Sequence, residues 1–298
     1  MCRRRNTSLR YDEQMTVLQV LQSTADYFKK RKIESPRLNA EHLLAHVLEK
    51  KRIELYLEFE RDLSETELVP LREMVRRRGQ GEPLQHLLGT VEFAGHVFIC
   101  DKRALVPRPE TEELVALLQS AISRCQSGSD QPSAILDVGT GSGVIALSLA
   151  AHFPEAMVSG VDISEKALSL AHENANRLGL SDRVKFSHGN LLEGIAGRFD
   201  VIVANLPYVA NADRATLSRE VLRDPESGVF GGEKGDEVIR KLIETAPVRL
   251  SPGGLLALEI GAGQADSLTA LLAEKNYHDI NARSDYSGQT RFLFGKYG

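Results

Sequence analysis

The chain of 298 residues lacks a long apolar run. Nowhere do about 18 consecutive apolar residues occur, so we expect no membrane span. The first residues, MCRRRNTSLRYDEQ, are basic but no apolar stretch follows them, which excludes a secretory signal. We expect residues 1–14 to be a disordered tail or an over-long gene start, with Met15 as an alternative first residue.

Cysteine is scarce, and the spacing of the cysteines does not match a metal site. Cys2, Cys100 and Cys125 are far apart, with no CxxC pair and no paired histidines nearby. This excludes the usual zinc-site spacings and a disulfide framework, so no metal is expected. A reducing, cytoplasmic location is the simplest inference.

An excess of positive charge is also absent. The net charge of −4 argues against a general nucleic-acid coat protein, and we expect no stable nucleic-acid binding. The hydrophobic fraction of 42% and the charged fraction of 26% are ordinary for a globular protein. The length allows one large domain or two modest ones, each with a real core.

The N-terminal part of the chain has helical periodicity. We expect a helical domain over 15–85, with Ser35 as the N-cap of a helix that begins at Pro36, and a capping box from Ser64 to Glu67. The basic runs 29–32 and 76–78 are interpreted as solvated helix ends. Two short strands around Ala94-Gly95 then form a hairpin linker over 86–106.

From residue 107 the pattern is that of an α/β protein. A helix is predicted at 109–123, a polar connector at 126–133, and from 134 strands and helices alternate. The predicted strands are at 134–138, 157–162, 183–188, 199–204, 254–260, 279–284 and 291–296. The predicted helices that alternate with them are at 143–152, 165–178, 235–249 and 263–275. Apolar runs such as AILDV and DVIVAN are typical of strands covered on both faces. The sequence therefore predicts a doubly wound, mostly parallel seven-stranded sheet over 107–298, with ligands at the carboxyl ends of its strands.

A glycine-rich turn follows the first of these strands. In ILDVGTGSGV the glycines at 139, 141 and 143 let a ligand approach the backbone closely. Asp162 ends the next strand, about twenty residues on, where an acid can bind both hydroxyls of a ribose. Alternatively, Asp162 caps the following helix, although Ser164 suits that role better.

Together these features resemble the S-adenosylmethionine site of class I methyltransferases. The resemblance implies a cofactor site made by the residues of the glycine loop, the ribose-binding acid and the ends of neighbouring strands. These residues are Asp137, Gly139, Thr140, Gly141, Ser142, Gly143, Asp162, Asn190, Leu191 and Asn205. By the same resemblance, Asp137 lies near the methionyl amino group.

A second motif, Asn205-Leu206-Pro207-Tyr208, directly follows the strand at 199–204. It is similar to the (Asn/Asp/Ser)-Pro-Pro-(Tyr/Phe) motif of methyltransferases that modify nitrogen on a planar group, with Leu206 in place of the first proline. An amide nitrogen is a poor nucleophile, so a catalyst must hold it in position. Asn205 and the carbonyl of Leu206 can accept its N–H groups, and the ring of Tyr208 can pack against the planar group.

A third motif indicates one particular family among the class I methyltransferases. The PRPETE segment at 107–112, within 82–115, resembles release-factor glutamine methyltransferases, and so do ESPRLNAEHLLAHVL at 34–48, GGLLALEIGAGQ at 253–264 and DYSGQTRFLFGK at 285–296. Asn39 stands at a usual aspartate position of that family. The resemblance implies methylation of the glutamine in the Gly-Gly-Gln segment of peptide-chain release factors, with the helical domain recognising the substrate.

Three further points stay open at the sequence level. The segment at 209–234 has little periodicity and is expected to be functional or mobile; its part RDPESGVFGGEKG, at 223–235, is a divergent version of the family's loop. The NLPY form also resembles ribosomal-RNA adenine dimethyltransferases. A third hypothesis is a module that binds the cofactor without catalysis.

Overall fold

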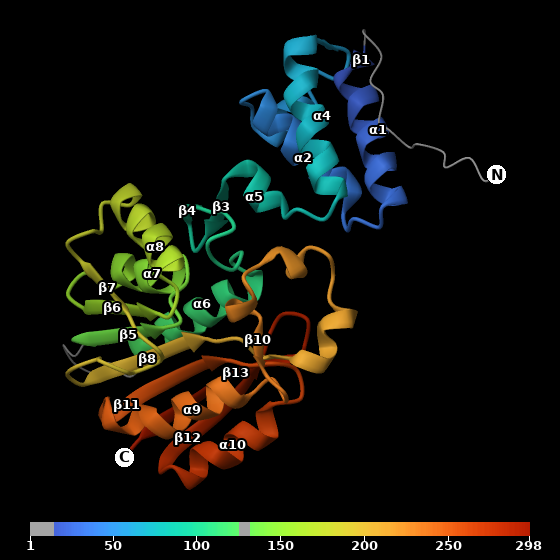
Figure 1. Ribbon diagram of the computed structural model, residues 1–298. Coiled ribbons are helices and arrows are strands. Elements are labelled where there is room, and N and C mark those ends of the chain that lie inside the picture. The colour runs from blue at the N-terminus through green and yellow to red at the C-terminus, as the bar shows by residue number, and fades with distance from the viewer. Residues whose placement is uncertain (1–14, 125–131) are drawn as a thin grey trace. The chain divides into compact units, whose positions relative to one another are not determined.

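The computed structural model describes residues 15–124 and 132–298 (Figure 1). The expected tail at 1–14 and most of the connector at 126–133 lie outside the described residues. The chain forms two compact units, one ending at Gly89 and one beginning at Thr90.

The first unit is helical, as predicted. Its helices are α1 (Val17–Lys30), α2 (Pro36–Val47), α3 (Arg52–Leu55), α4 (Glu65–Gly79) and α5 (Leu84–Leu88). Apolar side chains spaced along one side of α1, α2 and α4 form its core. A short antiparallel pair, β1 (Met15–Thr16) with β2 (Asp62–Leu63), was not predicted, because two-residue strands leave no periodicity in a sequence.

Both predicted helix starts are confirmed, but the two helices are capped in different ways. The capping box from Ser64 to Glu67 is confirmed, with the Ser64 N–H donating to the Glu67 carboxylate at 2.8 Å. Pro36 begins α2 and Ser35 is its N-cap, as predicted. Ser35 has a left-handed backbone (φ 45°) instead of the extended backbone of a capping residue, and its side chain makes no capping bond.

The basic run at the end of α4 is not wholly solvated, which corrects its interpretation. Arg78 is only 4% exposed. Its Nε donates to Oδ1 of Asn39 at 2.7 Å, and its Nη1 donates to the carbonyl of Glu82 at 2.9 Å. This guanidinium therefore belongs to the interior of the helical unit, where a buried charge needs such partners.

The second unit contains the predicted seven-stranded sheet, in the order β12-β13-β11-β8-β5-β6-β7. Its strands are β5 (Ala134–Val138), β6 (Met157–Asp162), β7 (Val184–His188), β8 (Phe199–Asn205), β11 (Leu250–Glu259), β12 (Tyr277–Ser284) and β13 (Thr290–Tyr297). β13 runs antiparallel to both β11 and β12, and the other neighbouring pairs of this sheet are parallel. The predicted α/β fold, doubly wound and mostly parallel, is confirmed.

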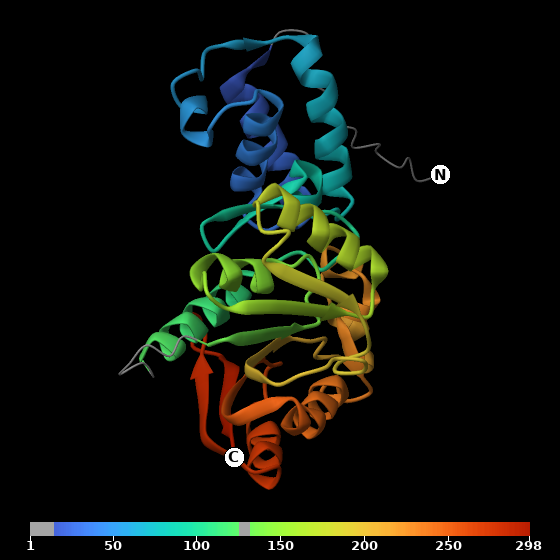
Figure 2. The same cartoon turned by 90° about the vertical axis from the view of Figure 1, so that its left-hand side faces the viewer.

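Helices cover both faces of this sheet (Figures 1 and 2). One face packs against α6 (Pro109–Arg124), α7 (Val144–His152) and α8 (Glu165–Arg177), and the other against α9 (Glu237–Thr245) and α10 (Ala265–Glu274). The helix predicted at 235–249 ends earlier, and a 3-10 turn at Ala246–Val248 follows it. Pro247 has no N–H to continue the α-helical bonding there.

The predicted hairpin consists of β3 (Thr90–Phe93) and β4 (His96–Ile99), joined at Ala94 and Gly95. It belongs to the second unit. Asn174 of α8 accepts the N–H of Ile99 at 2.6 Å and donates to the carbonyl of Ile99 at 3.2 Å, which fixes the hairpin against that helix.

The segment at 209–234 folds back on itself. Its ends form a parallel pair, β9 (Val209–Ala210) with β10 (Phe230–Gly232). Three short 3-10 helices lie between them, at Asn211–Thr216, Val221–Arg223 and Glu226–Gly228. The pair places β10 beside the chain that leaves β8, and so beside the NLPY motif.

Candidate active site

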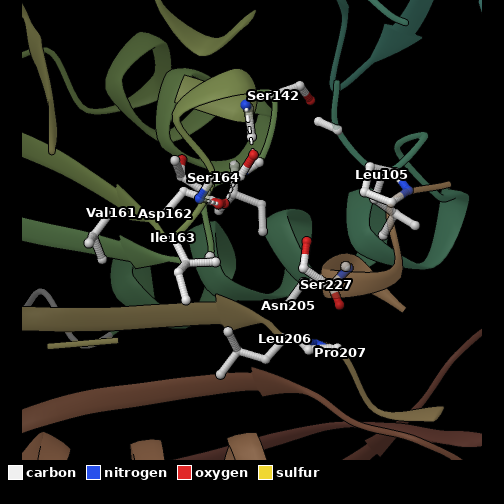
Figure 3. Close-up of a pocket in the computed structure, with 18 of the residues that line it drawn as sticks. Leu105, Ser142, Val161, Asp162, Ile163, Ser164, Asn205, Leu206, Pro207 and Ser227 are labelled. Carbon is white, nitrogen blue, oxygen red and sulfur yellow. Dashed lines mark hydrogen bonds between the residues drawn. The ribbon is translucent and has the colours of Figure 1, made fainter. Parts of the chain in front are cut away.

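A cavity of about 260 Å³ lies at the carboxyl ends of β5, β6 and β8. In the sheet order, β6 and β7 lie on one side of β5 while β8 and β11 lie on the other. Doubly wound sheets bind ligands where the strand order reverses in this way. Figure 3 shows Asp162 to Ser164 on one side of the cavity and Asn205 to Pro207 on another.

The glycine loop after β5 forms one wall. Its glycines have positive φ, namely 74° at Gly139, 57° at Gly141 and 82° at Gly143. The N–H groups of Gly139 and Thr140 both donate to the carbonyl of Val161, at 2.8 and 3.0 Å, which ties the loop to β6. A backbone in the left-handed region beside a ligand is a position where glycine is required.

The glycine loop and the NLPY motif touch each other. A Cβ placed on Gly139 would lie 2.8 Å from Cδ2 of Leu206 and 3.7 Å from the carbonyl oxygen of Asn205. Leu206 is 5% exposed, so its side chain fills the space beside the loop. The two motifs therefore meet at one edge of the sheet, as their positions after neighbouring strands predict.

Asp162 is held in place by backbone donors. Its Oδ2 accepts the N–H of Gly141 and its Oδ1 accepts the N–H of Ser164, both at 2.8 Å. Burial raises the pKa of this carboxyl group although these bonds oppose the shift. Ser164 is the N-cap of α8, accepting the N–H of Ala167 at 3.2 Å, so the carboxylate of Asp162 remains free of the capping role.

Asp137 lies beneath the glycine loop and is completely buried. Its Oδ2 accepts the hydroxyl of Thr140 at 2.6 Å and the N–H of Ala146 at 3.1 Å. Its Oδ1 is buried without a hydrogen-bond partner among the described residues. Burial raises the pKa of Asp137 to about 7. An unpaired buried carboxylate oxygen is a costly feature of a folded protein.

A chain of hydrogen bonds links Asn205 through Thr111 to the buried carboxylate of Glu259. Nδ2 of Asn205 donates to Oγ1 of Thr111 at 2.8 Å, and the hydroxyl of Thr111 donates to Oε2 of Glu259 at 2.8 Å. The hydroxyl of Tyr208 donates to Oε1 of the same carboxylate at 3.3 Å. Burial raises the pKa of Glu259 to about 7 and the pKa of Tyr208 well above its usual value.

The PRPETE segment also anchors the segment at 209–234. Nη2 of Arg108 lies 2.5 Å from Oδ2 of Asp224, and the N–H of Val106 donates to Oδ1 of Asp224 at 3.2 Å. Burial raises the pKa of Asp224 to about 6, although the charge of Arg108 lowers it. Through this anchor, Pro225 and Phe230 reach the cavity wall.

Most of the predicted site residues share this cavity. Those that line it are Gly139, Thr140, Gly141, Ser142, Asp162, Asn190, Leu191, Asn205, Leu206 and Pro207.

Three predicted site residues do not line the cavity. Asp137 is covered by the glycine loop, and a Cβ on Gly143 would meet Leu147 and Phe186, so that glycine serves helix packing. Tyr208 faces a second hollow, where its ring lies 5.7 Å from the guanidinium of Arg291. Its hydroxyl is bonded to Glu259, and the packing of its ring against the methylated group stays a prediction.

Three residues that contact the predicted site were not themselves predicted, namely Thr111, Glu259 and Arg108. Thr111 and Arg108 lie in the PRPETE motif, which carries the family resemblance but no predicted site residue. Glu259 is the last residue of an apolar strand, GGLLALE, and a lone acid at the carboxyl end of a central strand was the signal available.

The residues present fit S-adenosylmethionine. Asp162 can bind ribose hydroxyls, and the loop at 139–143, whose glycines have positive φ, lets the ligand pass close to the backbone. Within 15–124 and 132–298, no group of His, Cys, Asp or Glu side chains is arranged to hold a metal ion. No helix of the described chain is both long and apolar enough to cross a membrane.

Comparisons with known proteins identify the domains and the family. Residues 19–89 match the PrmC N-terminal domain, and residues 129–258 match a methyltransferase domain. Among solved structures, the T. thermophilus 16S rRNA N2 G1207 methyltransferase in complex with AdoMet and guanosine is 20% identical, with a TM-score of 0.52 over 70% of this chain and 50% of that one. This likeness shows the shared class I fold.

Curated relatives match nearly the whole length. The chain is 40% identical to a release factor glutamine methyltransferase of Rhodopirellula baltica, covering 95% of this chain and 96% of the relative. It is 39% identical to one of Chlorobaculum tepidum, covering 93% and 96%. The chain belongs to the family of release factor glutamine methyltransferases.

Proposed function

We propose that the protein transfers a methyl group from S-adenosylmethionine to the side-chain amide nitrogen of the glutamine in the Gly-Gly-Gln segment of peptide-chain release factors. The observation that carries this proposal is the contact between the two motifs: Leu206 packs on Gly139, so Asn205 and Asp162 line one cavity. The relatives that match nearly all of the chain bear the name of this activity.

The site suits an amide substrate. When bound, the cofactor supplies an electrophilic methyl group on a sulfonium sulfur. The amide lone pair is delocalised, so the protein must hold the nitrogen in one orientation. The carboxamide of Asn205 and the carbonyl of Leu206 are the proposed acceptors for the two N–H groups of the glutamine. No strong base is needed, because the proton can leave after the methyl group arrives.

The apolar and buried surroundings favour these contacts. Leu206 and Pro207 line the cavity next to Asn205, and Leu105 and Phe230 line it from other segments. Hydrogen bonds aimed at the reacting group are stronger in such a site than in water. The location proposed for the protein is the cytoplasm, where its substrate class acts, and no stable nucleic-acid binding is proposed, in keeping with a net charge of −4.

The test uses the full chain, labelled cofactor and a bacterial-type release factor. We expect label on the release factor, and mass spectrometry to place one methyl group on the glutamine of the Gly-Gly-Gln peptide. A release factor with that glutamine changed to alanine should stay unlabelled; labelling that persists in it would refute the proposal. Competition by ribosomal RNA would instead favour an RNA substrate.

A matched pair of variants tests the role of Asn205. Asn205→Ala should lower turnover by at least ~100-fold, in the range of removing one positioned hydrogen-bonding group, with little effect on cofactor affinity. Asn281→Ala, an exposed position in β12, should leave both quantities unchanged. A large loss of cofactor affinity in Asn205→Ala alone would contradict the assigned role.

A further inference from the structure

Glu259 occupies a special place beside the NLPY motif. It ends β11 and is paired in register with Asn205, which ends β8. Its side chain is buried, with the residue only 1% exposed. Each of its carboxylate oxygens accepts one hydroxyl, from Thr111 on one side and from Tyr208 on the other. One carboxylate therefore connects both polar ends of the motif.

We propose that Thr111 and Glu259 are positioning residues that fix which atom of the Asn205 carboxamide is offered to the substrate. This inference rests on the proposed function, because it concerns the orientation of the group that holds the substrate amide. The atoms involved are Oε2 of Glu259, Oγ1 of Thr111 and the amide atoms of Asn205, joined by two hydrogen bonds of 2.8 Å each.

The orientation follows from counting donors. Above its raised pKa of about 7 the Glu259 carboxylate is ionised and only accepts, and a hydroxyl has a single hydrogen to donate. The hydrogen of Thr111 therefore goes to Glu259, and Thr111 can only accept from its other neighbour. That neighbour must be the NH2 group of Asn205, so Oδ1 is left as the acceptor for a substrate N–H. The opposite orientation would present NH2 to the NH2 of a glutamine, donor against donor.

The surroundings of Glu259 are consistent with this chain of hydrogen bonds from Asn205 through Thr111 to Glu259, which we call the relay. Its charged neighbours are Arg291, which lowers its pKa, and Glu110, which raises it, while Thr111 and Tyr208 donate to its oxygens. Tyr208 thereby satisfies the second oxygen, which explains why its hydroxyl turns towards Glu259. A buried network of this kind specifies one arrangement only when each member has its partner.

The first experiment compares Thr111→Val with Thr111→Ser in the full chain, using release factor and labelled cofactor. Valine keeps the shape and removes the hydroxyl, so we expect kcat to fall at least ~10-fold while cofactor affinity changes less than ~3-fold. Serine restores donor and acceptor, so Thr111→Ser should recover most of the lost turnover. Ser148→Ala removes a buried hydroxyl that has no hydrogen-bond partner among the described residues, and should change neither quantity.

Two outcomes of this comparison of variants would overturn the proposal. One is Thr111→Val with the turnover of wild type; the other is Thr111→Ser as impaired as Thr111→Val. Should Thr111→Val fail to fold, the wild-type protein still provides a test. The side-chain NH2 protons of Asn205, assigned by their loss in Asn205→Ala, should exchange with solvent far more slowly than those of exposed Asn281, and equal exchange would also overturn it.

A substrate-free measurement separates this inference from the proposed function. Loss of the Thr111 donor should raise the pKa of Glu259, followed by NMR of 13C-labelled glutamate in wild type and Thr111→Val. An upward shift supports the relay even if no release factor is methylated, in which case only the proposed function fails. An unchanged Glu259 titration overturns the relay whatever the protein methylates.

Discussion

The substitution Gly139→Ala tests the contact between Gly139 and Leu206, on which the site depends. The backbone of Gly139 has φ 74°, and the left-handed region costs an alanine about 1–2 kcal/mol. The new Cβ would also lie 2.8 Å from Cδ2 of Leu206, so that side chain must move. Overpacking of this kind typically costs about 1–3 kcal/mol, which brings the expected loss of unfolding free energy to about 2–5 kcal/mol.

Gly179→Ala is the matched control. Gly179 has φ 69°, but a Cβ there meets nothing within 4 Å, so only the backbone strain remains. Urea unfolding followed by far-UV circular dichroism should show Gly139→Ala losing about 1–3 kcal/mol more than Gly179→Ala. Methyl transfer should fall at least ~10-fold in Gly139→Ala alone, because displacing Leu206 also displaces Asn205.

Leu206→Ala completes the test as a double-mutant cycle. Alone, truncating this buried leucine should cost about 2–5 kcal/mol. In the Gly139→Ala protein it should cost less, because the shorter side chain makes room for the new Cβ. A coupling of about 1–2 kcal/mol is expected, and additivity within about 0.5 kcal/mol would refute the proposed contact.

Three further predictions concern other parts of the cavity. Asp162→Asn should weaken cofactor binding at least ~10-fold in calorimetry, because a carboxamide cannot accept two ribose hydroxyls and two N–H groups; unchanged affinity would contradict the ribose role. Burial raises the pKa of Asp137 to about 7, so its contribution to stability is present below its usual pKa and is lost as pH rises through about 7. Asp137→Asn should therefore flatten the decline of the unfolding free energy between about pH 4 and about pH 7 in urea titrations, and an equally steep decline would refute this. Gly231→Ala would push a Cβ into the carbonyl oxygens of Pro207 and Gly235, so turnover should fall while cofactor affinity persists in the same assays; full turnover would show that β10 can shift freely.

The sheet could be predicted closely because its strands are buried on both faces. Continuous apolar runs mark such strands, and the predicted limits of β5 and β6 agree with the structure residue for residue. The glycine loop and NLPY could be placed together for a related reason: each directly follows a central strand. Parallel neighbouring strands bring their carboxyl ends to the same edge, so proximity followed from order alone.

Features that depend on register or on tertiary partners could not be predicted. Thr111 and Glu259 are separated by 148 residues, and only the pairing of β11 with β8 brings the glutamate beside Asn205. Arg78 was interpreted as solvated because a basic run is usually exposed, and its burial depends on Asn39 of another helix. The cavity-lining part of 209–234 has no periodicity, since 3-10 turns leave none.

The PRPETE segment at 107–112 begins α6 and also contacts two other parts of the site. A well-capped helix needs only Pro109 and nearby acids, and many sequences provide these. In the structure the segment does more: Arg108 pairs with buried Asp224, and Thr111 supports Asn205. It therefore joins the segment at 209–234 and the NLPY motif to the same helix start. Arg108 and Thr111 therefore serve different partners, a demand that a capped helix alone does not make.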